Sequence, residues 1–134
     1  MNKLPGIITN IQQSGAILLV DIKVADRLFS ALLIESANQP EWVKIGETID
    51  IVFKETEVSL AKNLSGQISL RNRMQCVVLK IDRGELLSRV FLKFQDYTLS
   101  SAITTRSVDS LNLNIGDEVE ALVKSNEVSL MKKR

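Results

Sequence analysis

This sequence contains no histidine, one cysteine and only six aromatic residues among its 134 positions. The lack of histidine removes the side chain most often used as a general base and as a metal ligand. The single cysteine, Cys76, excludes an intramolecular disulfide and any multi-cysteine metal site. We therefore expect no enzymatic activity, no metal-cation site and no organic cofactor.

The sequence also lacks the features that attract large charged or apolar partners. Its 17 basic and 16 acidic residues leave a net charge of +1, so no overall field draws it to nucleic acid or to a membrane surface. The longest apolar runs are too short to span a bilayer, and residues 1–6 do not begin a signal peptide. We expect a cytoplasmic protein that binds neither nucleic acid nor membranes.

The sequence does contain many apolar segments of strand length. The 45% apolar content comes mainly from Ile, Leu and Val, which favour strands. In residues 16–24, Leu18, Val20, Ile22 and Val24 lie on one face at period two, and only two residues separate this segment from the apolar run 27–34. This spacing predicts an antiparallel hairpin. The polar segment 35–41, which ends beside Pro40, is predicted to form a short helical turn or loop.

The chain repeats itself at an offset of 70 residues. Block 45–60 matches block 115–130 at seven of sixteen positions, and the polar segment 61–68 separates the two copies. The matched residues are Ile45, Gly46, Lys54, Glu57, Val58, Ser59 and Leu60. We therefore predict two tandem repeats, residues 1–63 and 64–134.

Each predicted repeat holds five short strands and one short helical turn, which indicates an all-β fold of two OB-like five-stranded barrels. We expect each barrel to close with the last strand of its own repeat. In the first repeat this strand covers residues 58–60, and in the second it covers residues 127–131.

Several spaced landmarks in the second repeat resemble one family. They are Ser69-Leu-Arg71-Asn72, Ala102-Ile-Thr104-x-x-Ser107 and Leu111-x-Leu-x-x-Gly116-x-x-Val119-x-Ala121-x-Val-Lys124-Ser125-x-x-Val128. This pattern resembles the Mop (TOBE-type) domain of the small molybdate-binding molbindins. The same domain forms the ligand-binding half of the molybdate-responsive transcription regulator and an accessory domain of molybdate transporter ATPases. The resemblance covers the second repeat throughout and the first more weakly.

The resemblance implies molybdate, often also tungstate, as the ligand, in a pocket between subunits or barrels. Carried over by position, the oxyanion-binding residues are Ser69, Arg71, Thr104, Ser107, Lys124 and Ser125. A candidate second site would use Ser36 and Lys54, but Glu55 stands where Ser125 stands and Leu33 where Thr104 stands. A carboxylate beside Lys54 would repel a dianion, so the first repeat either lacks a complete site or supplies part of one.

These residue types suit the implied ligand. A tetrahedral dianion has only acceptor oxygens, and hydroxyls with one arginine and one lysine supply donors and compensating charge. Two cationic side chains alone are too few for a micromolar site, which favours a pocket shared between the chains of a homo-oligomer, a dimer or a trimer. Taken singly, Thr104 and Ser107 could instead cap a helical turn.

The predicted function is molybdate binding for storage, homeostasis or sensing. The alternative is a regulatory or oligomerisation module of a molybdate transporter or regulator, without its own high-affinity site. An OB-type nucleic-acid binder ranks lower, because it would need stacking aromatics and a basic groove.

Overall fold

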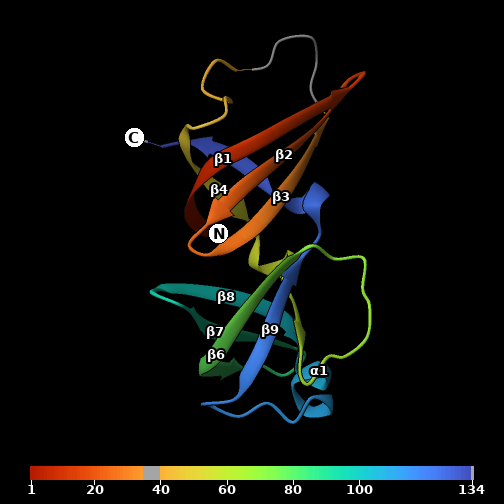
Figure 1. Cartoon of the computed structure of the whole chain (residues 1–134). Helices are drawn as coiled ribbons and strands as arrows, with labels where there is room; N and C mark the ends of the chain where they lie inside the picture. Colours follow the sequence, from red (N-terminus) through yellow and green to blue (C-terminus); the bar gives the residue numbers. More distant parts are fainter. Residues whose placement is uncertain (35–39, 134) are drawn as a thin grey trace.

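The computed structural model of the chain describes residues 1–34 and 40–133, and strands dominate it (Figure 1). One sheet contains β1 (Asn2–Ser14), β2 (Ile17–Val24), β3 (Arg27–Ile34), β4 (Thr48–Phe53) and β10 (Ser129–Lys132). The other contains β5 (Ser59–Ala61), β6 (Asn72–Arg83), β7 (Leu87–Phe94), β8 (Tyr97–Thr104) and β9 (Glu118–Val123). The predicted all-β class with two five-stranded units is confirmed.

Helical structure within the described residues is limited to three short elements. They are α1 (Thr105–Ser110) and the 3₁₀ turns η1 (Glu55–Glu57) and η2 (Ser125–Glu127). The element α1 is the helical turn expected in the second repeat. The turn or loop expected at 35–41 falls largely on residues 35–39, outside the described part of the chain. The sequence did not predict the two 3₁₀ turns.

The apolar alternation produces the buried face of each sheet. In β2, Leu18, Val20, Ile22 and Val24 are at most 1% exposed. The predicted two-residue connection after β2 is present: β2 pairs antiparallel with β3, and Ala25 adopts a left-handed φ of 55° in the turn. The ends of each sheet also meet, β3 with β10 and β8 with β5, so each sheet closes into a small barrel.

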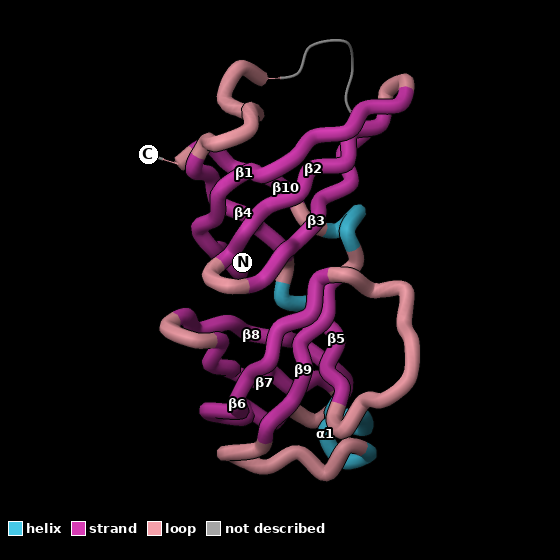
Figure 2. The backbone as a smooth tube through the Cα atoms, viewed as in Figure 1, coloured by secondary structure: helices cyan, strands magenta, loops and turns pink. Residues whose placement is uncertain are grey.

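Each barrel takes its fifth strand from the other repeat (Figure 2). Strand β10 pairs with β4, with Leu130 opposite Ile51, and β5 pairs with β9, with Leu60 opposite Ala121. The expectation that each repeat closes its own barrel was therefore wrong. The physical reason is that residues 58–60 and 128–130 have the same sequence, so either sheet accepts either segment. The boundaries 1–63 and 64–134 remain a prediction about the sequence repeat.

The two barrels share one apolar core. Phe29 of the first barrel and Phe94 of the second are each 1% exposed, and their ring centroids lie 6.3 Å apart. Cys76, which stands where the Mop pattern commonly has glycine, is also buried, and this burial raises the pKa of its thiol to about 12. The thiol is therefore a core group without nucleophilic character at neutral pH.

Deleting residues 129–134 tests the strand exchange. The deletion removes β10, so β4 in the first barrel becomes an edge strand, whereas β9 keeps both β5 and β6. We expect amide hydrogen exchange to accelerate more in β4 than in β9. Deletion of residues 133–134 alone is the control and should leave both strands protected. Faster exchange in β9 than in β4 would contradict the observed pairing.

Candidate functional site

The barrels meet at two similar junctions, and the first is built around Asn72. This side chain is 0% exposed at the start of β6 and bonds the backbone of Ser30 in β3 on the other barrel. The Ser30 N–H donates to Asn72 Oδ1 at 2.7 Å, and Asn72 Nδ2 donates to the Ser30 carbonyl at 2.9 Å. The buried amide therefore replaces a peptide group and holds β3 against β6.

The Ser30 side chain then meets the turn that follows β9. Its Oγ lies 2.7 Å from Oγ of Ser125, the first residue of η2. A shallow groove opens beside this pair and includes Arg71, the residue before Asn72. Its lining residues are Gln12, Leu19, Asp21, Leu28, Phe29, Ser30, Leu32, Arg71 and Ser125. The structure thus brings two of the predicted oxyanion-binding residues, Arg71 and Ser125, into one groove.

The groove is lined by one cation, Arg71, and one carboxylate, Asp21, and Lys124 lies next to the lining residue Ser125 in the chain. Arg71 and Lys124 are both exposed, and Lys124 directly precedes Ser125 at the start of η2. Asp21 supplies one carboxylate on the groove wall. Within the part of the chain that the structure describes, no carboxylate forms an ion pair with Arg71. The guanidinium is therefore available to a ligand.

The other predicted donor pair lies elsewhere on the second barrel. Thr104 caps α1: its Oγ1 accepts the Ser107 N–H at 3.1 Å and lies 2.8 Å from Ser107 Oγ. The element α1 is at the end of the second barrel far from the first barrel, whereas η2 lies beside β3 where the barrels meet (Figure 2). Thr104 and Ser107 of one chain therefore do not reach the groove of that chain.

The remaining predicted residues are dispersed. Ser69 is exposed in the segment before β6 and does not line the groove with Arg71. Lys54 is exposed at the start of η1. Ser36 lies outside the described residues. The candidate second site thus has one described member.

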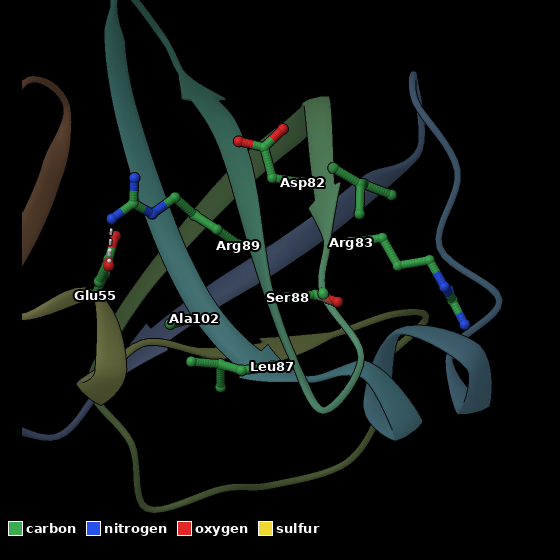
Figure 3. Close-up of a pocket in the computed structure, with 9 residues that line it drawn as sticks. Glu55, Asp82, Arg83, Leu87, Ser88, Arg89 and Ala102 are labelled. Atoms are coloured by element: carbon green, nitrogen blue, oxygen red, sulfur yellow. Dashed lines mark hydrogen bonds and ion pairs between the residues drawn. The ribbon is translucent and has the colours of Figure 1, made fainter.

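The second junction corresponds to the first but holds a carboxylate. Asn2 bonds the backbone of Ser100 in β8, with Nδ2 donating to the carbonyl at 2.8 Å and Oδ1 accepting the N–H at 2.9 Å. Glu55 accepts from Arg89 Nη2 at 2.9 Å and from Ser100 Oγ at 2.8 Å. Figure 3 shows Arg89 and Glu55 facing each other, with Arg83 directed away from them. These bonds, with Arg89 contributing most, lower the pKa of Glu55.

Sequence reasoning missed the roles of Ser30 and Arg89. The repeat offset could have indicated the first, because residues 30 and 100 are both serine and lie 70 positions apart. No comparable signal marks Arg89, since its counterpart is Leu19.

Residues 1–34 and 40–133 contain neither a cluster of metal-binding side chains nor a membrane-spanning helix. No group of three or more Cys, Asp or Glu side chains there could hold a metal ion. No helix in the same residues has the length and apolarity needed to cross a membrane.

Part of the chain matches a known domain family, and several known proteins are similar to it in sequence. The family model for the TOBE domain matches residues 68–130. The molybdenum import ATP-binding protein ModC of Brucella abortus (strain 2308) is 44% identical over 73 residues, which are 54% of this chain and 20% of that protein. The molybdenum transport protein ModE of Herbaspirillum seropedicae is 24% identical over 131 residues, 95% of this chain and 48% of that protein. The chain thus spans between a fifth and a half of these relatives' lengths.

Among solved structures, the cytoplasmic molybdate-binding protein ModG, with molybdate bound, shares the fold. It superposes with a TM-score of 0.92 at 24% sequence identity, covering 98% of this chain and 96% of that chain. The match extends over both barrels, so it bears on the whole fold and not on one repeat alone.

Replacing Asn72 by alanine tests whether this residue holds the first junction. Two buried hydrogen bonds would be lost, and each unsatisfied partner costs about 1–3 kcal/mol. We expect Asn72→Ala to lower the free energy of unfolding by about 2–4 kcal/mol in a urea titration. Asn10→Ala, at an exposed position of β1, is the matched control and should change it by less than about 0.5 kcal/mol. Equal effects of the two substitutions would contradict the assignment.

Proposed function

We propose that this chain is a tandem Mop/TOBE protein and that it binds molybdate in the cytoplasm. The match of the TOBE family model to residues 68–130 supports the first part of this proposal. Tungstate, a tetrahedral oxyanion of the same charge, is the expected second ligand. The groove at the first junction carries the proposal, because Arg71 and the hydroxyls of Ser30 and Ser125 face one space there. No carboxylate of residues 1–34 or 40–133 forms an ion pair with Arg71. The relatives ModC, ModE and ModG, each named for molybdenum or molybdate, support it.

The donors of this groove suit an anion that cannot itself donate. Arg71 offers a planar fork of N–H groups, and Lys124 is close enough in the chain to add a second positive charge. Each hydroxyl carries one hydrogen, and the bond between Ser30 and Ser125 uses one of the two. One hydroxyl hydrogen therefore remains for a ligand. Asp21 opposes anion binding and must be offset by the two cations.

These groups alone are too few for tight binding. A micromolar site requires about 8 kcal/mol, and a charge-assisted hydrogen bond contributes about 1.5–3 kcal/mol before the cost of immobilising the ligand. Two cations and one hydroxyl fall short of that sum. Further donors must come from outside the groove of a single chain.

A second copy of the chain is the proposed source of those donors. Thr104 and Ser107 lie exposed or half-buried at α1, remote from their own groove. The groove is bordered by the end strand β3, where Leu28 is 58% exposed and Leu32 is 37% exposed. Exposed apolar side chains of this kind favour contact with another subunit. A homodimer or trimer that docks α1 of one chain near β3 of the next would complete the site.

The physiological role is proposed to be storage, homeostasis or sensing of molybdate by a binding protein rather than by an enzyme. The alternative is a regulatory or oligomerisation module without its own high-affinity site, which the comparisons do not favour. Saturable binding of molybdate by this chain would distinguish the two functions, because a regulatory or oligomerisation module does not need a high-affinity site of its own.

Substitution of Arg71 tests the ligand and its groove. Wild-type protein titrated with molybdate in a calorimeter, at known oligomeric state, should show saturable heat, and sulfate should show none. We expect Arg71→Ala to weaken molybdate binding at least about tenfold, because a charge-assisted bond contributes about 1.5–3 kcal/mol. Lys23→Ala removes an exposed cation of β2 outside the groove and should bind as wild type does. Absence of heat from wild-type protein would remove molybdate as the ligand.

Mixed oligomers test whether two chains share the site. Arg71→Ala chains and Ser107→Ala chains should each bind poorly alone. When they are co-expressed and mix randomly, about one quarter of the shared sites combine an intact Arg71 with an intact Ser107 from a neighbour. We expect that fraction of wild-type sites to return, as counted by calorimetry. No recovery in verified mixed oligomers would indicate that one chain supplies both residues or that Ser107 takes no part.

A further inference from the structure

The two junctions are built from corresponding residues but differ in charge. Residues 70 positions apart pair as Asn2 with Asn72, Ser100 with Ser30, Glu55 with Ser125, and Arg89 with Leu19. Both asparagines make the same two backbone hydrogen bonds, within 0.2 Å of each other in each bond. The asparagine frames are therefore alike, and the junctions differ in the charged residues around them, at positions 55 and 89 and at Arg71, whose counterpart is Met1.

At the second junction the Glu55 carboxylate is itself the anion, and it is hydrogen-bonded to residues of the second barrel. One of its oxygens accepts from Arg89 of β7, as Figure 3 shows, and the other accepts from Ser100 of β8. A guanidinium and a hydroxyl converging on an anion are the donor types expected for an oxyanion ligand. The pKa of Glu55 is lowered by these contacts, so the carboxylate stays charged at neutral pH. Its side chain is only 23% exposed.

The first junction has the opposite arrangement. Ser125 there meets Ser30 through a neutral hydroxyl pair, and Leu19 stands where Arg89 would stand. The positive charge comes instead from Arg71, which has no carboxylate partner in the described part of the chain. Each junction thus has one arginine, and among the described residues a carboxylate pairs with Arg89 but not with Arg71.

We propose that Glu55 is an internal anion that closes a latent oxyanion site to which Arg89 and Ser100 contribute, leaving one open junction site per chain. The further donors of the latent site would come from a neighbouring chain, as proposed for the first junction. The inference rests on the proposed function for its ligand class, a tetrahedral oxyanion. A carboxylate tethered beside its donors has a high effective concentration, so a dissolved anion competes poorly with it. The charge of Glu55 also repels a second anion at contact distance. Removal of the carboxylate frees both donors at once.

The test replaces Glu55 by serine, the residue found at the open junction. Molybdate bound per chain at saturation is counted by equilibrium dialysis and elemental analysis for wild type, Glu55→Ser and Glu47→Ser. We expect Glu55→Ser to bind one more molybdate per chain than wild type. Glu47→Ser removes an exposed carboxylate of the same barrel and should keep the wild-type count. The added site should vanish in the double variant Glu55→Ser, Arg89→Ala, because that variant lacks the cation.

The outcomes separate this inference from the proposed function. An unchanged count in Glu55→Ser, with wild type binding, overturns the latent site and leaves the proposed function intact. Binding by Glu55→Ser but not by wild type supports the latent site and removes the proposed function. Binding by neither overturns both. Circular dichroism verifies folding, and Glu55→Ala, which also frees Arg89 and Ser100, should show the same added molybdate if the serine variant does not fold.

Discussion

The reciprocal exchange of fifth strands is the constraint on which the rest of this structure depends. Strand β4 has its outer edge covered by β10, and β9 has its outer edge covered by β5. Neither repeat can complete a barrel without the other. The exchange needs no special side chains, because Val58 and Val128 head identical tripeptides and are each 2% exposed. The two barrels therefore form one cooperative unit, with an apolar core that continues between them.

The junctions follow from this exchange. To deliver its last strand, each repeat must cross to the other barrel, and it does so through a 3₁₀ turn that contacts that barrel's third strand: η2 contacts β3, and η1 contacts β8. The first residue of each turn, Ser125 or Glu55, then lies beside a serine of the opposite barrel. The residues with binding chemistry are thus positioned by the same crossings that close the fold.

The sequence predicted the parts of this architecture that depend on local pattern. Alternation in β2 and the short connection at Ala25 predicted the first hairpin, and the offset of 70 predicted two units. The sequence could not predict the strand exchange, because two identical tripeptides do not indicate which sheet each of them joins. Of the candidate site, Arg71 and Ser125 share a groove, but spacing along the chain could not reveal that Thr104 lies at the far end of the barrel.

The tandem arrangement explains how the two junctions could diverge in charge. Each junction combines residues of both repeats, so a change at position 55 affects only the second, and a change at position 125 affects only the first. The residues at positions 55 and 89 are matched in charge: Glu55 occurs with Arg89, whereas their counterparts Ser125 and Leu19 are both neutral. A glutamate opposite leucine would leave a largely buried carboxylate without its cation, which is costly. A glutamate at position 55 therefore requires a cation at position 89, although 34 positions separate the two residues in the chain.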